Sequence, residues 1–180
     1  HIPVKFGIIN PDGQEILPEN NTVVELKKEV QTISFEDVPP GSVPSYLRGF
    51  SAPVKLQTDL SNKELAFLMS HDSDEFNKWD AAQTLYINET KRFVSSYQSQ
   101  EIPSIDTGLL SAFKTALNDN SIDKAFLAKM LTLPAESEIK DHFDPINVEG
   151  IHSAKVSIEQ QIAEQLELEF YNKIKECADA

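Results

Sequence analysis

The sequence of 180 residues is poor in cysteine, glycine, methionine and tryptophan, with one, six, two and one of each. Cys177 has no second cysteine to pair with, so an internal disulfide and a cysteine metal cluster are excluded, and a reducing, cytoplasmic location is expected. The glycines never cluster, which excludes a phosphate-binding glycine loop. No run of about 18 apolar residues is present, so no membrane span is expected.

Positive charge is also scarce, with 16 basic against 29 acidic residues and a net charge of −13. Binding to a phosphate backbone depends mainly on lysine and arginine, so we expect no nucleic acid partner. A hydrophobic content of 40% with 25% charged residues is typical of a globular protein. The sequence therefore predicts a folded chain with a sizeable core.

The first third of the chain alternates apolar and polar residues, with Pro, Gly and Asn at the interruptions, which indicates short strands joined by turns. We predict an antiparallel, immunoglobulin-like β-sandwich over residues 1–58. Turns are expected at residues 10–13 and 18–21. The predicted strands are residues 2–8, 15–17, 22–26, 32–35, 45–50 and 54–58.

From residue 59 the apolar period changes to that of a helix, and Ser61 with Glu64 forms a capping box. Residues 59–180 are therefore predicted to be part of an all-α bundle or superhelix. The predicted helices are 61–71, 75–97, 104–118, 121–131, 135–142 and a last one from Asp144-Pro145. Its expected buried stripe is Ile151, Ile158, Ile162, Leu166, Phe170 and Ile174, and the expected stripe of the long helix is Phe76, Trp79, Tyr86, Phe93 and Tyr97.

The titratable residues show no catalytic or metal-binding pattern. The histidines His1, His71, His142 and His152 lack the three- or four-residue spacing of a zinc helix, and His71 is expected to cap a helix end. Carboxylates on helix surfaces are usually solvated, which is our interpretation of Asp74 with Glu75, and of Glu164, Glu167 and Glu169. We therefore predict no catalytic, cofactor-binding or metal-binding residue in this chain.

Three further patterns are interpreted as structural. Trp79 is expected in the core of the helical half, with Asp80 paired locally. Ser51 and Ser70 lack a nucleophile elbow. The glycosylation patterns at 20–22 and 88–90 are assigned no role, because the second falls within a helix and nothing indicates secretion.

Several segments resemble the bacterial aminopeptidase N (alanyl aminopeptidase) family of zinc metallopeptidases, in order and along nearly the whole chain. They are Leu-Arg-Gly-Phe-Ser-Ala-Pro-Val-Lys-Leu at 47–56, Glu-Leu-Ala-Phe-Leu-Met at 64–69 with His71, Phe-Asn-Lys-Trp-Asp-Ala-Ala-Gln at 76–83, and Leu-Thr-Leu-Pro at 131–134. The resemblance implies a small β-sandwich followed by the first part of a helical domain that closes over an active site.

The family's zinc motif, distal zinc-binding glutamate, Gly-x-Met-Glu-Asn motif and catalytic tyrosine belong to domains that match nothing in this sequence. The chain opens at His1 without a methionine and carries apolar residues almost to its end. We therefore expect a non-catalytic piece of a zinc aminopeptidase, with zinc and peptide substrates bound by the parent. Its expected partner is the catalytic domain of the same parent chain, and self-association through the last helix is also expected.

Two other functions remain open at this stage. The loop around Pro39-Pro40-Gly41 would recognise a ligand if the chain were an immunoglobulin-like binding module with a helical interaction domain. Asp80 and a second carboxylate would act together if the chain were an enzyme itself, although no convergent triad is present. In the preferred interpretation the junction at 50–54 holds the two halves together, and Phe50 is expected to be buried.

Overall fold

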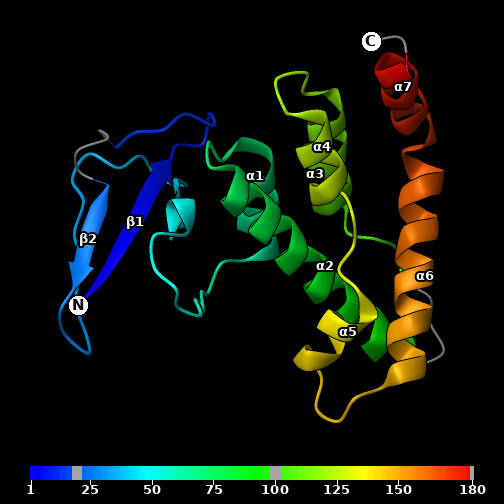
Figure 1. Cartoon of the computed structure of the whole chain (residues 1–180), viewed down its shortest axis with the longest axis horizontal. Coiled ribbons are helices and arrows are strands. Elements are labelled where there is room, and N and C mark those ends of the chain that lie inside the picture. Colours follow the sequence, from blue (N-terminus) through cyan, green and yellow to red (C-terminus); the bar gives the residue numbers. More distant parts are fainter. Residues whose placement is uncertain (18–21, 98–102, 179–180) are drawn as a thin grey trace. The chain divides into compact units, whose positions relative to one another are not determined.

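A computed structural model describes residues 1–17, 22–97 and 103–178, so the turn predicted at 18–21 lies outside the described residues. The chain divides into two compact units, His1–Ala81 and Ala82–Ala180, which are described separately here. Figure 1 shows a small sheet in the N-terminal part and helices in the remainder. The predicted fold class, an antiparallel β domain followed by helices, is confirmed.

The sheet of the first unit has three antiparallel strands, in the order β2-β1-β3. The strands are β1 (Ile2–Ile9), β2 (Val23–Leu26) and β3 (Val43–Tyr46). The first half of β1 pairs with β2 and the second half with β3. Along β1 the four residues from Phe6 to Ile9 are all buried, and because successive side chains point to opposite faces, both faces are covered there.

Three of the predicted strands are wrong. Residues 15–17 contribute one isolated bridge, between Ile9 and Glu15. Residues 32–35 alternate but form no ladder, because Phe35 instead lays its ring edge against Phe6, with ring centroids 5.0 Å apart. Residues 54–58 are also irregular, and the Val54 N–H closes a tight turn onto the Ala52 carbonyl directly after Pro53, which has no N–H to give to a ladder.

The strand predicted at 45–50 stops at Tyr46 and gives way to a short 3₁₀ helix, η2 (Arg48–Phe50). Leu47, Gly49 and Phe50 all have positive φ angles, of 56°, 60° and 52°. This left-handed backbone cannot continue a strand, so the chain turns sharply here. The turn determines where the Arg48 side chain points.

The first two α-helices that follow begin at the predicted caps. Helix α1 (Asn62–His71) has the expected capping box, in which Ser61 and Glu64 each accept from the other's backbone N–H. Helix α2 (Glu75–Tyr97) begins where Asp74 accepts from the Asn77 N–H. Residues 75–81 of α2 belong to the first unit and the others to the second.

The second unit contains five further α-helices among its described residues. They are α3 (Thr107–Asn118), α4 (Lys124–Met130), α5 (Glu136–Ile139), which runs into the 3₁₀ helix η3 (Lys140–His142), α6 (Val148–Gln165) and α7 (Glu167–Ala178). The predicted start at Asp144-Pro145 is wrong, because the Asn147 side chain accepts from the Gly150 N–H and starts α6 at Val148. A break at Leu166 separates α6 from α7.

The core of the second unit is apolar. Its least exposed large side chains include Tyr86, Leu109, Phe113, Met130, Ile139 and Ile158. The aromatic stripe predicted on α2 is confirmed at Tyr86 and Phe93 but wrong at its ends, since Phe76 is 38% and Tyr97 55% exposed. The stripe on the last helices is likewise buried as far as Leu166, whereas Ile174 is exposed.

Candidate functional site

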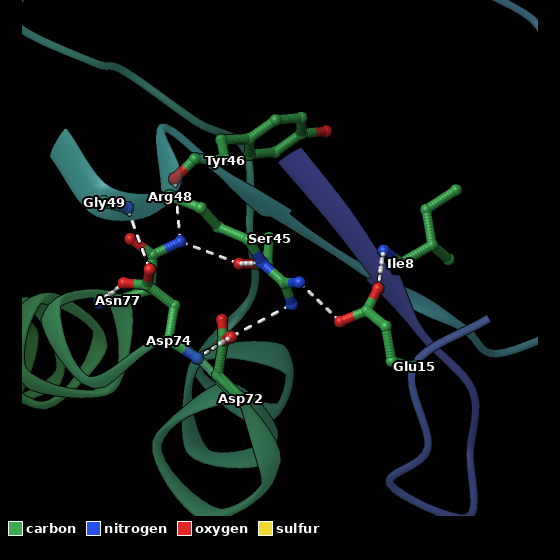
Figure 2. Close-up of polar contacts among 9 residues, drawn as sticks. All are labelled: Ile8, Glu15, Ser45, Tyr46, Arg48, Gly49, Asp72, Asp74 and Asn77. Carbon is green, nitrogen blue, oxygen red and sulfur yellow. Dashed lines mark hydrogen bonds and ion pairs between the residues drawn. The ribbon is translucent and has the colours of Figure 1, made fainter. Parts of the chain in front are cut away.

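Buried polar side chains of the first unit gather around one arginine. Four of them are Ser45, Arg48, Asp72 and Asn77, and the carboxylates of Glu15 and Asp74 complete what we name the Arg48 cluster. Figure 2 shows these side chains converging from β1 and its turn, from the end of β3, and from the junction of α1 and α2. The cluster is the candidate site because buried charges are costly unless they are paired.

The local backbone places Arg48 inside the unit. Arg48 lies in η2 directly after the left-handed residue Leu47, and its side chain is 8% exposed. The guanidinium lies against Gly7 of β1, where a Cβ atom would be 2.1 Å from the Arg48 Cζ. Only a glycine leaves room for this close approach.

Each nitrogen group of the Arg48 guanidinium has an acceptor. Nε donates to Ser45 Oγ at 2.9 Å, Nη2 donates to Asp72 Oδ1 at 3.0 Å, and Nη1 donates to Glu15 Oε2. Glu15 is held in turn, because its Oε1 accepts from the Ile8 N–H at 3.0 Å. A planar guanidinium suits such convergent acceptors and stays charged at any ordinary pH.

Asp72 is the most constrained carboxylate of the cluster. Its side chain is 0% exposed, and Oδ1 accepts from both Arg48 and the Asp74 N–H, the latter at 2.9 Å. Oδ2 is buried with no hydrogen-bond partner among the described residues. Burial raises the pKa of Asp72, while hydrogen bonding by Ser45 and the Asp74 backbone, and the charge of Arg48, act in the opposite direction.

Asp74 and Asn77 tie the start of α2 to the end of the sheet. Asp74 accepts from the Asn77 N–H at 3.0 Å and, through its other oxygen, from the Gly49 N–H at 2.8 Å. The Asn77 side chain donates to Ser45 Oγ at 2.7 Å and to the Tyr46 carbonyl at 2.8 Å. The residues that begin α2 therefore also bind the turn that follows β3.

The hydrogen bonds and ion pairs of the cluster hold the segment after β1, the end of β3 and the start of α2 together. A cavity of about 470 Å³ opens onto the cluster, since Glu15, Arg48 and Asp74 line it together with Lys5, Leu17, Thr22 and Ser73. Within the cluster, however, the guanidinium nitrogens are engaged by protein acceptors, and no histidine, cysteine or lysine is paired with a nucleophile. The cluster therefore joins segments of the chain that are distant in sequence.

The predicted histidines lie apart from this cluster. His71 ends α1 and lies against Phe67, with ring centroids 4.7 Å apart, and burial followed by the charge of Lys78 lowers its pKa. His152 Nδ1 is 2.8 Å from Glu136 at the surface. Within residues 1–17, 22–97 and 103–178, no group of three or more His, Cys, Asp or Glu side chains is placed to hold a metal ion.

Two of the residues considered in the sequence behave differently in the structure. Asp74 was expected to be solvated, but both of its oxygens bind backbone N–H groups, so that interpretation is wrong. Phe50 was expected to be buried and is 56% exposed, since the positive φ angles of η2 turn it out to an edge-on contact with Phe76 at 5.4 Å.

The remaining predicted features are structural. Trp79 is only partly buried and belongs to the first unit, so its assignment to the core of the helical half is wrong. Thr90 of the second glycosylation pattern is 0% exposed, with its hydroxyl bonded to the Tyr86 carbonyl. The loop at Pro39–Gly41 is a tight turn, closed by the Ser42 N–H and hydroxyl onto the Pro39 carbonyl.

Comparison with known families matches nearly the whole chain. Residues 62–180 match the family described as "Domain of unknown function (DUF3458_C) ARM repeats". The chain belongs to this family. Residues 1–59 match the companion family, "Domain of unknown function (DUF3458) Ig-like fold".

Curated relatives of the chain are bacterial aminopeptidases. It is 33% identical to aminopeptidase N of Escherichia coli over 92% of this chain, and 32% identical to aminopeptidase N of Haemophilus influenzae over 94%. In both cases it covers 20% of the relative, so the chain spans about one fifth of their length. The predicted resemblance to the aminopeptidase N family is confirmed.

A solved structure leads to the same conclusion. The fold matches the crystal structure of Legionella pneumophila aminopeptidase A in complex with aspartic acid, with a TM-score of 0.82 and 28% identity. The match covers 96% of this chain and 20% of that one. The chain therefore corresponds to a section of an aminopeptidase.

Proposed function

We propose that this chain is a non-catalytic section of a zinc aminopeptidase that removes N-terminal residues from peptides. Within the parent, the section acts as a spacer and as part of the lid over the active site. The observation that carries this proposal is that the chain matches one fifth of the length of two bacterial aminopeptidases. It is supported by the Arg48 cluster, whose ion pairs connect separate segments of the first unit. A spacer needs such rigid joints and no catalytic side chain.

Zinc and substrate belong to the parent in this proposal. The described residues offer at most paired candidates such as His152 with Glu136, whereas a zinc site uses three or four ligands. No mechanistic step is therefore assigned to a metal in this section. No described helix has the length and apolar character needed to cross a bilayer. The cytoplasmic location expected from the single cysteine stays part of the proposal.

The first test compares the chain with the longer protein that its reading frame encodes. Both are incubated with zinc and an alanyl nitroanilide, and the release of nitroaniline is followed. The longer protein is expected to turn over and to lose activity with a chelator, while the chain alone is inactive. Zinc-dependent turnover that co-purifies with the isolated chain would overturn the proposal.

The lid role needs a second measurement, made in the longer protein. Arg48→Ala loosens the cluster and is expected to change the ratio of kcat/KM for a long peptide to that for a dipeptide amide. Arg92→Ala, which removes a partly exposed arginine paired with Glu89 in the second unit, is the matched control and should leave the ratio unchanged. A ratio that is the same in all three proteins would contradict the lid role while leaving the family assignment intact.

The isolated chain is also proposed to self-associate through α7. Leu168, Tyr171 and Ile174 are 66%, 63% and 67% exposed, and no residue of α7 is buried. Polar contacts link α7 to α3 and to the loop after it: Lys114 Nζ lies 2.6 Å from Glu169 Oε1, and Lys173 Nζ donates to Asn120 Oδ1 at 2.8 Å. In stacked helical repeats a neighbouring helix covers a face of this kind, so a second copy takes that place when the chain is alone.

Light scattering over a dilution series tests this association. The average mass should fall on dilution, and Ile174→Lys should make the chain monomeric throughout. Val30→Lys is the control, because Val30 is an apolar side chain of the first unit that is 82% exposed. A monomeric wild-type chain at high concentration would rule out association through α7.

A further inference from the structure

We infer that α1 and the first turn of α2 unfold together with the sheet as one cooperative unit, and that Arg48 couples them. The boundary between independently unfolding parts then lies within α2, well after the connector at residues 59–61. The two families meet at that connector, because one matches residues 1–59 and the other residues 62–180. The inference does not depend on the proposed function.

The first observation is that hydrogen bonds cross from the sheet to the helices. Four run from residues 45–49 to residues 72–77: Arg48 to Asp72, the Gly49 N–H to Asp74, and Asn77 Nδ2 to Ser45 and to the Tyr46 carbonyl. If the sheet separated from the helices, the buried groups on both sides would lose these partners at once.

The second observation is that the same carboxylates also serve the helices. Asp72 Oδ1 accepts from Arg48 and from the Asp74 N–H, and Asp74 accepts from Gly49 and from the Asn77 N–H that begins α2. The Asp72 and Asp74 carboxylates therefore both hold the start of α2 and bind the turn after β3. Loss of one interaction weakens the other, which is the condition for cooperative unfolding.

The third observation is the apolar packing of the first unit. The three-stranded sheet alone has few residues with which to form a core. The remaining buried apolar residues of the unit come largely from α1, namely Leu65, Ala66, Leu68 and Met69. The compact unit accordingly extends to Ala81 and includes both α1 and the start of α2.

Native-state hydrogen exchange on the full chain, over a series of low urea concentrations, tests the inference. Amides of β1 at Phe6 and Ile8 and amides of α1 at Met69 and Asp72 should share one opening free energy and one urea dependence. Amides of α3 and α6, such as Phe113 and Ile158, should show different values. Protection of α1 that follows α3 and α6 would overturn the inference.

Two variants separate coupling by Arg48 from mere proximity. Arg48→Ala should raise exchange rates in β1 and α1 together, by roughly a hundredfold or more if breaking the buried pair has its usual cost. Arg92→Ala, the matched control, should raise them only in the second unit. Faster exchange confined to β1, or equal acceleration throughout the chain, would refute the coupling.

If Arg48→Ala does not fold, the wild-type exchange pattern still decides the unit boundary, and Arg48→Lys decides the role of the guanidinium. Lysine keeps the charge but cannot reach three acceptors at once. The expected result is intermediate acceleration, equal in β1 and α1. Wild-type rates in both segments would mean that a positive charge at position 48 suffices, and would overturn the role given to the guanidinium.

Discussion

Each unit of the chain buries a carboxylate that pairs with an arginine and also binds backbone, but the two sites are built differently. Asp72 is matched with Arg48, 24 residues away in the sequence, and the Arg48 side chain is 8% exposed. Glu89 is matched with Arg92, one helical turn away, and the Arg92 side chain is 42% exposed. The first pair joins separate segments, whereas both members of the second lie on α2, from which Arg92 also donates to the Ser104 carbonyl.

The two carboxylates also differ in the number of hydrogen bonds that their oxygens accept. Glu89 accepts from Arg92 with both oxygens and from the Asp106 N–H at 2.8 Å, just before α3. Asp72 has one oxygen with no hydrogen-bond partner among the described residues. The stability of the second unit thus comes mainly from apolar packing between helices. The first unit has a smaller apolar core, and its stability depends on the buried ion pairs of Arg48.

The largest expected effect comes from Arg48→Ala. It leaves Asp72 and Glu15 without their cation, and breaking a buried pair from one side typically costs about 3–5 kcal/mol. Trp79, the only tryptophan, lies in the first unit, so urea unfolding followed by its fluorescence measures the change there. An unchanged urea midpoint would show that the first unit does not depend on the Arg48 pairs, and that the contrast with Arg92 does not hold.

Gly7→Ala is expected to be next. Its Cβ would lie 2.1 Å from the Arg48 Cζ, so the guanidinium must move, and overpacking of this kind typically costs about 1–3 kcal/mol. In the background of Arg48→Ala the same substitution should cost much less. The double-mutant cycle in urea unfolding measures this coupling, and strictly additive effects would contradict the contact.

Arg92→Ala removes the pair with Glu89 and the hydrogen bond to the Ser104 carbonyl. It should destabilise the second unit by only about 1–2 kcal/mol, because the arginine is partly solvated and Glu89 keeps the Asp106 N–H. Far-ultraviolet circular dichroism during urea unfolding follows the helices of this unit, with Trp79 fluorescence as the control. A loss as large as that of Arg48→Ala would remove the distinction between the local and the long-range pair.

Phe50→Ala should cost less than about 1 kcal/mol, since an exposed edge-on contact with Phe76 is the main interaction lost. The matched variant Phe6→Ala removes a ring that is 5% exposed and should cost about 3–5 kcal/mol. Urea midpoints of the two proteins give the comparison. Similar losses would mean that Phe50 is buried in solution.

The smallest effect is a pH dependence. Burial raises the pKa of Asp72 in the folded state above its ordinary value of 3.8. Between pH 3.8 and this raised pKa, the folded state therefore binds more protons than the unfolded state. The contribution of Asp72 to stability therefore falls as pH rises through this range. The difference in unfolding free energy between the wild type and Asp72→Asn should shift against the wild type as pH rises, and the opposite slope would mean that Arg48 dominates over burial.

Much of the helical half could be predicted because its signals are local. The capping box at Ser61 and Glu64 and the cap at Asp74 use side chains within three residues of the groups they bind. The fold class also followed from the change of apolar period at residue 59, and the family resemblance followed from short motifs. The predicted domain boundary after residue 58 stays a prediction.

The strands were less predictable, because alternation of apolar and polar residues does not by itself establish backbone pairing. Residues 32–35 alternate as a strand does, yet Phe35 covers Phe6 without forming a ladder. The Arg48 cluster was missed for a related reason. Arg48 was visible within a motif, but its partners Glu15 and Asp72 lie 33 and 24 residues away in the sequence.

The sequence by itself determined where α1 and α2 begin, the scarcity of groups for redox or phosphate chemistry, and the family, because each depends on residue types at short spacing. Only the tertiary structure decided that Arg48 is buried, that Asp74 binds Gly49, and that Phe50 faces outward. These depend on the left-handed turn at residues 47–50 and on the missing Cβ of Gly7, whose place the Arg48 guanidinium takes. Charges distant in sequence become partners only when the backbone brings them together and excludes water.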